Sequence, residues 1–274
     1  SCYRLFMLHE GRWKEYRVTE SRAAGRGEYD LRGRIAVVTG GSNGIGASTV
    51  RRLARAGATV VVGYNSGRER AEEIIAGLGG GQHIALRIPM EDSAAIVAAA
   101  ATVQQTFGKV HVLVNSAGVT RAVPHADLDG LDDATFDRIL MTNVRGPFAT
   151  IRAFASLLRG SGDGIVINIS SISGFTGLGS SIAYCASKAA LDTMGLSLAR
   201  VLAPEVRVIT IAPAAVATDF VPGRGREGVE KQAASTPLKQ VAEPDDVALA
   251  IISAVTHLRL TTGSSIVVDS GRHL

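Results

Sequence analysis

The sequence predicts an α/β fold in which a doubly wound parallel sheet forms a single domain. Three observations predict it. Short apolar runs rich in Val and Ile recur along the chain, separated by longer stretches with helical spacing. The first of these runs leads into a glycine-rich turn and then a helix. Polar residues follow several runs where each ends, as expected where parallel strands deliver side chains to one edge of a sheet.

The composition limits the class of protein and the partners that can be expected. The chain has 274 residues, of which 46% are hydrophobic and 20% charged, which suits one large core. The net charge of +4 is spread among interleaved acidic and basic residues, so no nucleic-acid partner is predicted. No apolar run reaches the roughly 18 residues that span a bilayer, and the N-terminus lacks a signal-peptide core. Cys2 and Cys185 are expected to be free thiols in a reducing compartment, so we predict a cytoplasmic protein without a membrane or metal partner.

Residues 1–30 form an N-terminal extension, separate from the domain at 31–274. Neither a helical nor a strand period holds for long in this extension, which carries Trp13 among alternating charges. Two interpretations stay open: a segment that packs on the body or on a neighbouring subunit, and a poorly ordered one.

The first strand and its turn predict a nucleotide site. The apolar run Ile35 to Val38 is followed by glycines and then by the helical pattern Ala47 to Ala56. Such glycines let the backbone turn tightly and approach a diphosphate, while the helix N-terminus offers free N–H groups. The residues expected at the phosphates are Gly40, Ser42, Asn43, Gly44, Ile45 and Gly46.

The end of the second strand indicates which cofactor binds. An acidic residue there holds the ribose 2′-hydroxyl of NAD, but this chain has Tyr64, Asn65 and Ser66 after the strand from Ala58. These side chains donate hydrogen bonds, and Arg68 or Arg70 adds charge, so NADP is favoured. A hydroxyl-rich turn also admits NAD. An Asp introduced at Tyr64 is expected to move the preference to NAD.

The middle of the chain continues the alternation of strand and helix. Strands are predicted at 84–88 and 110–114, the second opening into Asn115-Ser116-Ala117-Gly118. His111 lies among apolar positions and is expected to be structural. One long helix is predicted from Asp132 to about Arg159, followed by a strand at 164–169 that ends at Ser170-Ser171.

Tyr184 and Lys188 lie four residues apart in a helical run, so both side chains project from one face. An ammonium roughly 4 Å from a phenolate stabilises it by about 4 kcal/mol at an effective dielectric near 20. At about 1.36 kcal/mol per pKa unit, this predicts a phenol pKa of about 7 and a Tyr184 suited to general acid/base catalysis. The strand edge brings Ser171 to the same site.

These residues resemble the short-chain dehydrogenase/reductase family, and most closely its 3-oxoacyl-carrier-protein reductase branch. The resemblance covers roughly Leu31 to the C-terminus. It rests on motifs in the family's order: the glycine turn Thr39 to Gly46, Asn115 to Gly118, Asn143, Ser171, and Tyr184 with Lys188. It implies a Rossmann fold, a homotetramer, and hydride transfer between NADP(H) and a ketone or secondary alcohol.

The resemblance also implies a role for each site residue. Ser171 would polarise the substrate oxygen, and Tyr184 would exchange the proton with it. Lys188 would lower the pKa of the phenol and hold the nicotinamide ribose, while Asn143 would bind a water that links Lys188 to solvent. The remaining cofactor contacts that it implies are Asn115, Ala117, Gly118, Pro213, Val216 and Thr218.

Three positions depart from the family's pattern. Pro89 stands where an Asp usually touches the adenine, Ala214 replaces the glycine of a Pro-Gly pair, and Ser270 replaces a glycine near the end. None of them belongs to the proton relay, so we expect activity to be retained while cofactor affinity and substrate choice change.

The segment from Ala214 to about Gln240 follows the carboxyl end of a strand and is expected to form a substrate lid. Its basic residues Arg224, Arg226 and Lys231 either meet an acidic substrate or carrier protein or lie on a solvated loop. Candidates for an apolar substrate pocket are Val123, Phe175, Val216 and Phe220.

The sequence therefore predicts an NADP(H)-dependent oxidoreductase that acts on a small carbonyl or alcohol substrate, with a carrier-bound 3-oxoacyl thioester as one candidate. The enzymatic alternative is an NAD-dependent sugar or polyol dehydrogenase. The alternative from another class is a nucleotide-sensing protein without turnover, which the presence of Ser171, Tyr184 and Lys188 disfavours.

Overall fold

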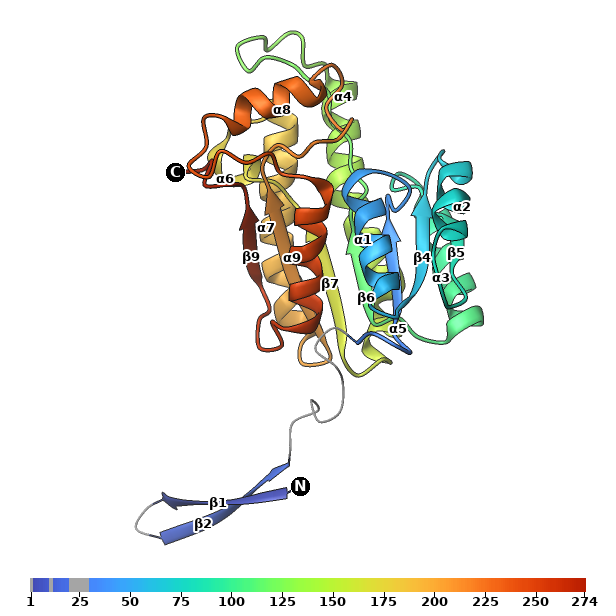
Figure 1. The fold of residues 1–274 in the computed structure, drawn as a ribbon, viewed down its shortest axis with the longest axis vertical. Coiled ribbons are helices and arrows are strands. Elements are labelled where there is room, and N and C mark those ends of the chain that lie inside the picture. Colours follow the sequence, from blue (N-terminus) through green and yellow to red (C-terminus); the bar gives the residue numbers. More distant parts are fainter. Residues whose placement is uncertain (1, 10–11, 20–29) are drawn as a thin grey trace. The chain divides into compact units, whose positions relative to one another are not determined.

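The computed structural model describes residues 2–9, 12–19 and 30–274, and the chain divides into two compact units (Figure 1). The units are Ser1–Asp30 and Leu31–Leu274. In the described residues no helix is both long enough and apolar enough to cross a membrane.

The larger unit is built on a seven-stranded parallel sheet in the order β5-β4-β3-β6-β7-β8-β9. Its strands are β3 (Ile35–Thr39), β4 (Thr59–Tyr64), β5 (Ile84–Arg87), β6 (Val112–Asn115), β7 (Gly164–Ile169), β8 (Val206–Pro213) and β9 (Ser264–Val268). The predicted doubly wound parallel sheet is confirmed. The strand order changes direction between β3 and β6, and in such sheets this is where ligands bind, at the carboxyl ends of the strands.

Helices cover both faces of this sheet and explain why its strands are apolar at successive positions. In β3, Ala36 and Val38 join one buried cluster while Val37 joins the other. The first cluster lies under α1 (Gly44–Arg55), α2 (Arg68–Ala76) and α9 (Pro244–Thr256). The second lies under α3 (Ser93–Phe107), α5 (Gly146–Arg159) and α7 (Ile182–Leu202). Figure 1 shows α4 (Asp133–Leu140), α6 (Ser173–Thr176) and α8 (Gly225–Ala233) toward the end to which the strand arrows point.

The long helix predicted from Asp132 to Arg159 is interrupted, so that prediction was wrong in one respect. A π-helical turn, η1 (Met141–Arg145), separates α4 from α5. At its centre, the Asn143 side chain accepts a hydrogen bond from the Val119 N–H and donates one to the Val119 carbonyl, each at 2.9 Å. These contacts with a distant loop accompany a wider turn, which the apolar spacing of the helix does not encode.

The smaller unit contains two antiparallel strands, β1 (Cys2–His9) and β2 (Arg12–Thr19), with Cys2 opposite Thr19 and His9 opposite Arg12. The sequence left two interpretations open for this segment, one packed on the body or on a neighbouring subunit and one poorly ordered, and it did not predict these strands. Main-chain pairing of adjacent segments makes a hairpin without requiring a regular side-chain pattern. The rest of the predicted extension, residues 1, 10–11 and 20–29, lies outside the described residues.

Two reactive side chains of the larger unit are structural. His111 is 5% exposed, and its Nδ1 accepts a hydrogen bond from the Ile35 N–H at 3.0 Å, as the sequence predicted. Cys185 is a buried free thiol, and burial raises its pKa, which makes it a poor nucleophile.

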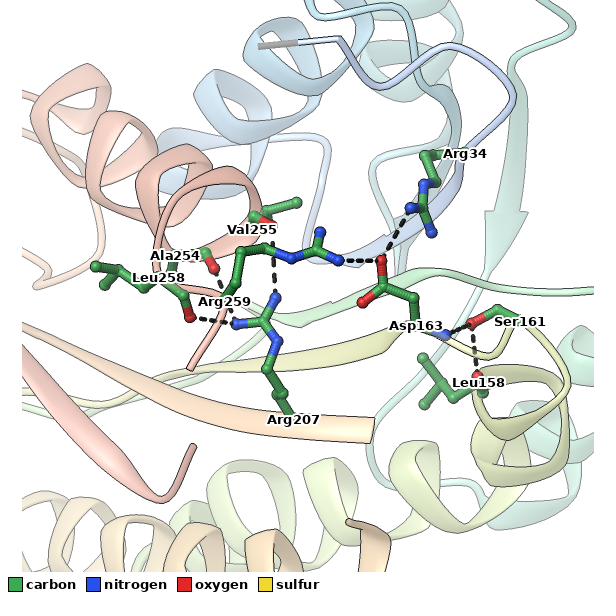
Figure 2. A network of polar contacts seen from close by, with 9 residues as sticks. All are labelled: Arg34, Leu158, Ser161, Asp163, Arg207, Ala254, Val255, Leu258 and Arg259. Carbon is green, nitrogen blue, oxygen red and sulfur yellow. Dashed lines mark hydrogen bonds and ion pairs between the residues drawn. The ribbon is translucent and has the colours of Figure 1, made fainter. Parts of the chain in front are cut away.

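Charged groups connect several segments at the end of the sheet where the strands β3 and β7 begin (Figure 2). Asp163, just before β7, accepts hydrogen bonds from Arg34 at 2.9 Å and from Arg259 at 2.6 Å. Beside it, Arg207 donates from Nη1 to the Leu258 and Ala254 carbonyls at 2.8 and 3.2 Å. Ala254 lies in the last turn of α9 and Leu258 just after it, so the guanidinium stabilises this helix end. The network thus joins segments before β3, before β7 and after α9.

We expect Asp163→Asn to lower the free energy of unfolding by about 1–2 kcal/mol at pH 7, because both guanidinium groups lose their counter-charge. Burial alone raises the pKa of Asp163, but Arg259 and Arg34 outweigh burial and hold it below its ordinary value. The stabilisation is therefore complete above the unfolded-state pKa of about 3.9 and is lost as the pH falls through the lower folded-state value.

Urea unfolding between pH 3 and pH 7 measures this difference. Asp137→Asn, at an exposed carboxylate on α4, is the matched control and should leave stability unchanged. Equal stability of wild type and Asp163→Asn at pH 7 would contradict the prediction.

Candidate active site

A cavity of about 550 Å³ opens along the carboxyl ends of the strands. Its wall runs from the glycine turn after β3, past the ends of β4 and β5, to Tyr184 and Lys188 on α7 and Phe220 beyond β8. The predicted site residues that line it are Gly40, Ser42, Asn43, Gly44, Ile45, Asn65, Ser66, Ala117, Gly118, Tyr184, Lys188, Pro213 and Thr218. One concave site therefore contains both the predicted phosphate turn and the predicted proton donor.

The glycine turn leaves no room for side chains. A Cβ on Gly46 would collide with the carbonyl oxygen of Gly40, and a Cβ on Gly40 would lie 2.9 Å from the Ala117 main chain. Thr39 Oγ1 accepts hydrogen bonds from the N–H groups of Ser116 and Ala117, both at 3.2 Å, which joins the turn to the loop after β6. Asn43 caps α1 by accepting from the Gly44 N–H at 2.8 Å. The turn is thus held close to the start of α1, where main-chain N–H groups suit an anion.

Beyond this turn the cavity is polar and basic. Asn65, Ser66 and Arg70 line it, and the Ser42 hydroxyl and the Arg70 guanidinium both lie next to Gly67. Of the two arginines proposed from the sequence, Arg70 lines the cavity, while the exposed Arg68 pairs with Glu72 on its own helix at 2.8 Å. This end of the site has the donors and the charge that a phosphate needs.

Tyr64 does not line this cavity, contrary to the expectation from the sequence. Its side chain packs against the buried cluster under α1, α2 and α9, because successive residues of a strand point to opposite faces. Its neighbour Asn65 takes the cavity position instead.

The end of β5 contributes residues that the sequence analysis missed. Arg87, Glu91, Asp92 and Arg138 all line the cavity. Arg87 ends a parallel strand, so the same strand-edge argument that selected Asn65 applies to it. Arg138 lies on α4, where nothing in the local sequence signals that it faces a site. Pro89 and Met90 line the wall beside them, at the position where the family's pattern has an Asp.

The proton-transfer residues meet where β7 and α7 approach each other. The Ser171 hydroxyl lies near the Tyr184 phenol and lowers the pKa of that phenol. Ser171 is itself held by Ser173, whose N–H donates to its Oγ at 3.1 Å. The Lys188 ammonium donates to the Ile169 carbonyl at 2.7 Å and lies 5.5 Å from the centre of the Tyr184 ring. The phenol and the ammonium thus belong to residues that line the cavity, and Ser171 is buried beside them.

The electrostatics of this group differ from the expectation. Burial raises the pKa of Tyr184 to about 12, although the Ser171 hydroxyl and the charge of Arg224 lower it in part. Burial also lowers the pKa of Lys188 to about 8, opposed by the charge of Asp192. The predicted phenol pKa of about 7 is wrong for the protein alone, because burial raises the pKa of Tyr184 and Lys188 is not among the groups that lower it.

Asn143 supports the site from the π-helical turn. Besides its two bonds to Val119, its Nδ2 donates to Ser187 Oγ on α7 at 3.1 Å, and the side chain is 1% exposed. The amide thus fixes the loop after β6 against α7, next to Lys188. Because its side chain is fully engaged, a water link to Lys188 would have to use the main chain of this turn.

Several predicted residues lie behind the cavity wall. Asn115 is buried, donates to Asn168 at 2.9 Å and accepts from Thr150 at 2.6 Å, so it fixes the end of β6. Val216 is buried in the core. Of the proposed apolar pocket, Phe220 lines the cavity, whereas Phe175 is half exposed and packs edge-on against His273.

These residues fit a dinucleotide. The cradle at Gly40 and Gly46 admits a diphosphate, Asn65, Ser66 and Arg70 suit the adenosine ribose, and Tyr184 with Lys188 marks the nicotinamide end. Among the described residues, no group of three or more His, Cys, Asp or Glu side chains is arranged to hold a metal ion.

Comparison with known proteins gives relatives over most of the chain. The family model described as short chain dehydrogenase matches residues 34–227. A protein named ketoacyl reductase 2 of the granaticin polyketide synthase, from Streptomyces violaceoruber, is 36% identical over 88% of this chain and 96% of its own length. D-threitol dehydrogenase from Mycolicibacterium smegmatis is 34% identical over 89% of this chain and 94% of its own. A short chain dehydrogenase from Burkholderia cenocepacia, solved in complex with NADP, superposes with a TM-score of 0.81 at 33% identity, covering 89% of this chain and 99% of that one.

Proposed function

Because this chain belongs to the short-chain dehydrogenase/reductase family and is an oxidoreductase of CH–OH groups, we propose that it transfers a hydride between NADP(H) and a ketone/secondary-alcohol pair. The observation that carries the proposal is that the glycine turn after β3 and the pair Tyr184 and Lys188 line one cavity. The site combines a place for a dinucleotide with a proton donor for the substrate oxygen.

Each residue then has a role that follows from its contacts. The bound nicotinamide supplies the hydride, and Tyr184 supplies the proton to the substrate oxygen. Ser171 orients the phenol and offers a neutral hydrogen bond to the oxygen as negative charge develops there. Lys188, anchored on the Ile169 carbonyl, provides positive charge next to the ring and a donor for the cofactor ribose. Asn143 positions the loop and helix around Lys188.

We propose NADP as the preferred cofactor. The support is the group formed by Ser42, Asn65, Ser66 and Arg70, which places donors and one guanidinium in the cavity at the end of β4. The B. cenocepacia structure was solved with NADP, which agrees with this preference. NAD-dependent turnover of a sugar or polyol is the alternative, since D-threitol dehydrogenase is also a relative.

We expect Asn65→Asp to reverse this preference, lowering the ratio of kcat/KM with NADPH to kcat/KM with NADH by about 100-fold. A carboxylate at this position repels a 2′-phosphate and competes for Arg70, and such like-charge contacts cost several kcal/mol. The substitution is made at Asn65 and not at Tyr64, because Asn65 lines the cavity and Tyr64 faces the core. Asn65→Ser is the uncharged control and should keep the wild-type ratio. Steady-state kinetics with both cofactors measures it, and an unchanged ratio in Asn65→Asp would refute the NADP assignment.

The first experiment is consumption of NADPH and of NADH by the purified chain against an acetoacetyl thioester, a cyclic diketone and several keto sugars. We take the 3-oxoacyl thioester as the first candidate because of the ketoacyl reductase relative. Turnover of any ketone by wild type supports the proposed function. Tight binding of cofactor with no turnover of any of these, or of the matching alcohols with the oxidised cofactors, would instead favour a nucleotide-sensing protein.

A homotetramer and a cytoplasmic location remain predictions from the sequence. The exposed apolar side chains on the helices next to the sheet agree with subunit contacts, since Phe148 on α5 is 41% exposed and Val201 on α7 is 65% exposed.

A further inference from the structure

The cavity extends past the end of β5, where its wall is apolar. Ile88 and Met90 line it there and are 2% and 5% exposed, and the buried Pro89 between them has no N–H to donate. Glu91 follows directly and also lines the cavity, but its side chain is 49% exposed. An apolar surface with a carboxylate at its margin suits a flat ring whose edge donates hydrogen bonds.

The Glu91 carboxylate is fixed in the cavity wall and keeps free acceptor capacity. Its Oε1 accepts a hydrogen bond from Thr142 Oγ1 at 2.9 Å and lies 3.5 Å from Arg138 Nε. Thr142 is on η1 and Arg138 on α4, and both line the cavity. Within the part of the chain that the structure describes, Oε2 accepts no hydrogen bond. A carboxylate has about four acceptor positions, so a ligand in the cavity can still donate to this one.

The loop that carries Glu91 is held in place by Arg145 of η1. The Arg145 guanidinium donates to the Glu91 carbonyl at 2.6 Å and to the Met90 carbonyl at 3.4 Å. It also donates to Ser93 Oγ at 2.5 Å. A Cβ on Gly146 would lie 2.7 Å from the Met90 Cβ, so the loop packs directly on the start of α5. These contacts fix the main chain from which the Glu91 side chain extends, as a selective hydrogen bond requires.

Asp92 is the other acidic residue that lines the cavity among the described residues, and the fold uses it. Its Oδ1 accepts a hydrogen bond from the Ala95 N–H at 3.0 Å as the N-cap of α3. An N-cap carboxylate is oriented by the helix that it caps, whereas Glu91 is oriented by two residues that themselves line the cavity. Glu91 is therefore the acceptor that the cavity presents to a ligand.

The order of groups along the wall assigns this end to the base of a dinucleotide. Tyr184 marks the nicotinamide end, the glycine turn suits the diphosphate, and Asn65 suits the adenosine ribose. Strands β4 and β5 pair with Tyr64 opposite Arg87, so their ends lie side by side, about 4.8 Å apart. A base attached to a ribose at the end of β4 therefore reaches the wall at the end of β5.

We propose that Glu91 selects the base of the cofactor by accepting a hydrogen bond from the 6-amino group of adenine. This inference rests on the proposed function and names a residue that determines its cofactor specificity. A carboxylate accepts hydrogen bonds and donates none, so it favours an amino group and repels the lone pairs of a 6-oxo group. Ile88 and Met90 then face the ring. Glu91 supplies the acceptor that Pro89, at the position where the family's pattern has an Asp, does not.

Equilibrium binding tests the base preference without turnover. Isothermal titration calorimetry of the full chain compares NADP⁺ and NAD⁺ with their deamino forms, in which hypoxanthine replaces adenine. We expect wild type to bind the adenine form about 10- to 100-fold more tightly, the range for a hydrogen bond to a charged group. Glu91→Gln should reduce this ratio to about 1–2, because an amide accepts from a 6-amino group and donates to a 6-oxo group. Glu73→Gln, at an exposed carboxylate on α2 outside the cavity wall, should retain the wild-type ratio.

Near-equal binding of the two bases by wild type would overturn the proposal, as would a preference that survives in Glu91→Gln. Glu91→Ala is the second variant and should lose the preference mainly through weaker binding of the adenine form. Ketone reduction with NADPH separates this inference from the proposed function. A base preference that depends on Glu91, without reduction of any ketone, refutes the function alone. Equal binding of the two bases with efficient ketone reduction refutes the role of Glu91 alone.

Discussion

Tyr184→Phe is expected to lower kcat/KM for ketone reduction by about 1,000-fold or more while NADPH affinity stays within about 2-fold of wild type. The substitution removes the phenol proton and little else, since the ring keeps its contact with Phe220. General acid catalysis is worth about 10²–10⁴-fold.

Steady-state kinetics and NADPH fluorescence titration on the same preparation measure both quantities. Thermal unfolding of the variant controls for loss of structure. Residual activity within 10-fold of wild type would show that Tyr184 is not the proton donor, whatever the cofactor affinity.

The rates of ketone reduction and of alcohol oxidation should depend differently on pH. With a pKa of about 12, the phenol is protonated at neutral pH and ready to donate, so reduction should not require a deprotonated tyrosine. Alcohol oxidation requires the phenolate. As long as the pH is below the pKa, the phenolate population rises tenfold for each unit of increase in pH. We therefore expect oxidation by wild type to accelerate between pH 7 and pH 9, and reduction to show no such rise.

Gly46→Ala is expected to remove most cofactor affinity and to lower the free energy of unfolding by about 3 kcal/mol. The added methyl would collide with the Gly40 carbonyl oxygen and lie 2.8 Å from its carbon. Both partners are main chain, so no side-chain rotation relieves the contact, and overpacking of this kind typically costs about 1–3 kcal/mol. The turn must move away from α1, which opens the diphosphate cradle.

Urea unfolding and NADPH titration test this prediction. Gly79→Ala is the matched control, because a Cβ at Gly79 meets nothing within 4 Å. Wild-type cofactor affinity in Gly46→Ala would show that the close approach of turn and helix is not needed for binding.

The sequence predicted the features that depend on residues close together in the chain. Apolar runs such as Ile35 to Val38 are determined by burial on both faces, so the strands and the helices between them could be read directly. The glycine turn is also local, because Gly40 and Gly44 adopt positive φ values of 64° and 48° within one short segment. The spacing of Tyr184 and Lys188 needed only the helical repeat.

Patterns that depend on contacts between distant segments were missed. The turn that holds Asn143 depends on hydrogen bonds to Val119, 24 positions away in the chain. Of the three residues predicted at the end of β4, Asn65 and Ser66 line the cavity but Tyr64 packs against the core, because the side-chain direction at the end of a strand is set by the packing of its sheet. Arg138 entered the cavity through the placement of a whole helix.

The sequence by itself therefore determined the order of the elements, the glycine turn and the candidate residues for proton transfer. Only the tertiary structure decided their electrostatics and the neighbours that tune them. Burial set the pKa of Tyr184 far above the value that its spacing from Lys188 suggested, and Arg224 approached it from beyond β8. The reason is physical: hydrogen bonding within a helix or turn is short-range, whereas desolvation and charge interactions sum over every segment that packs around a group.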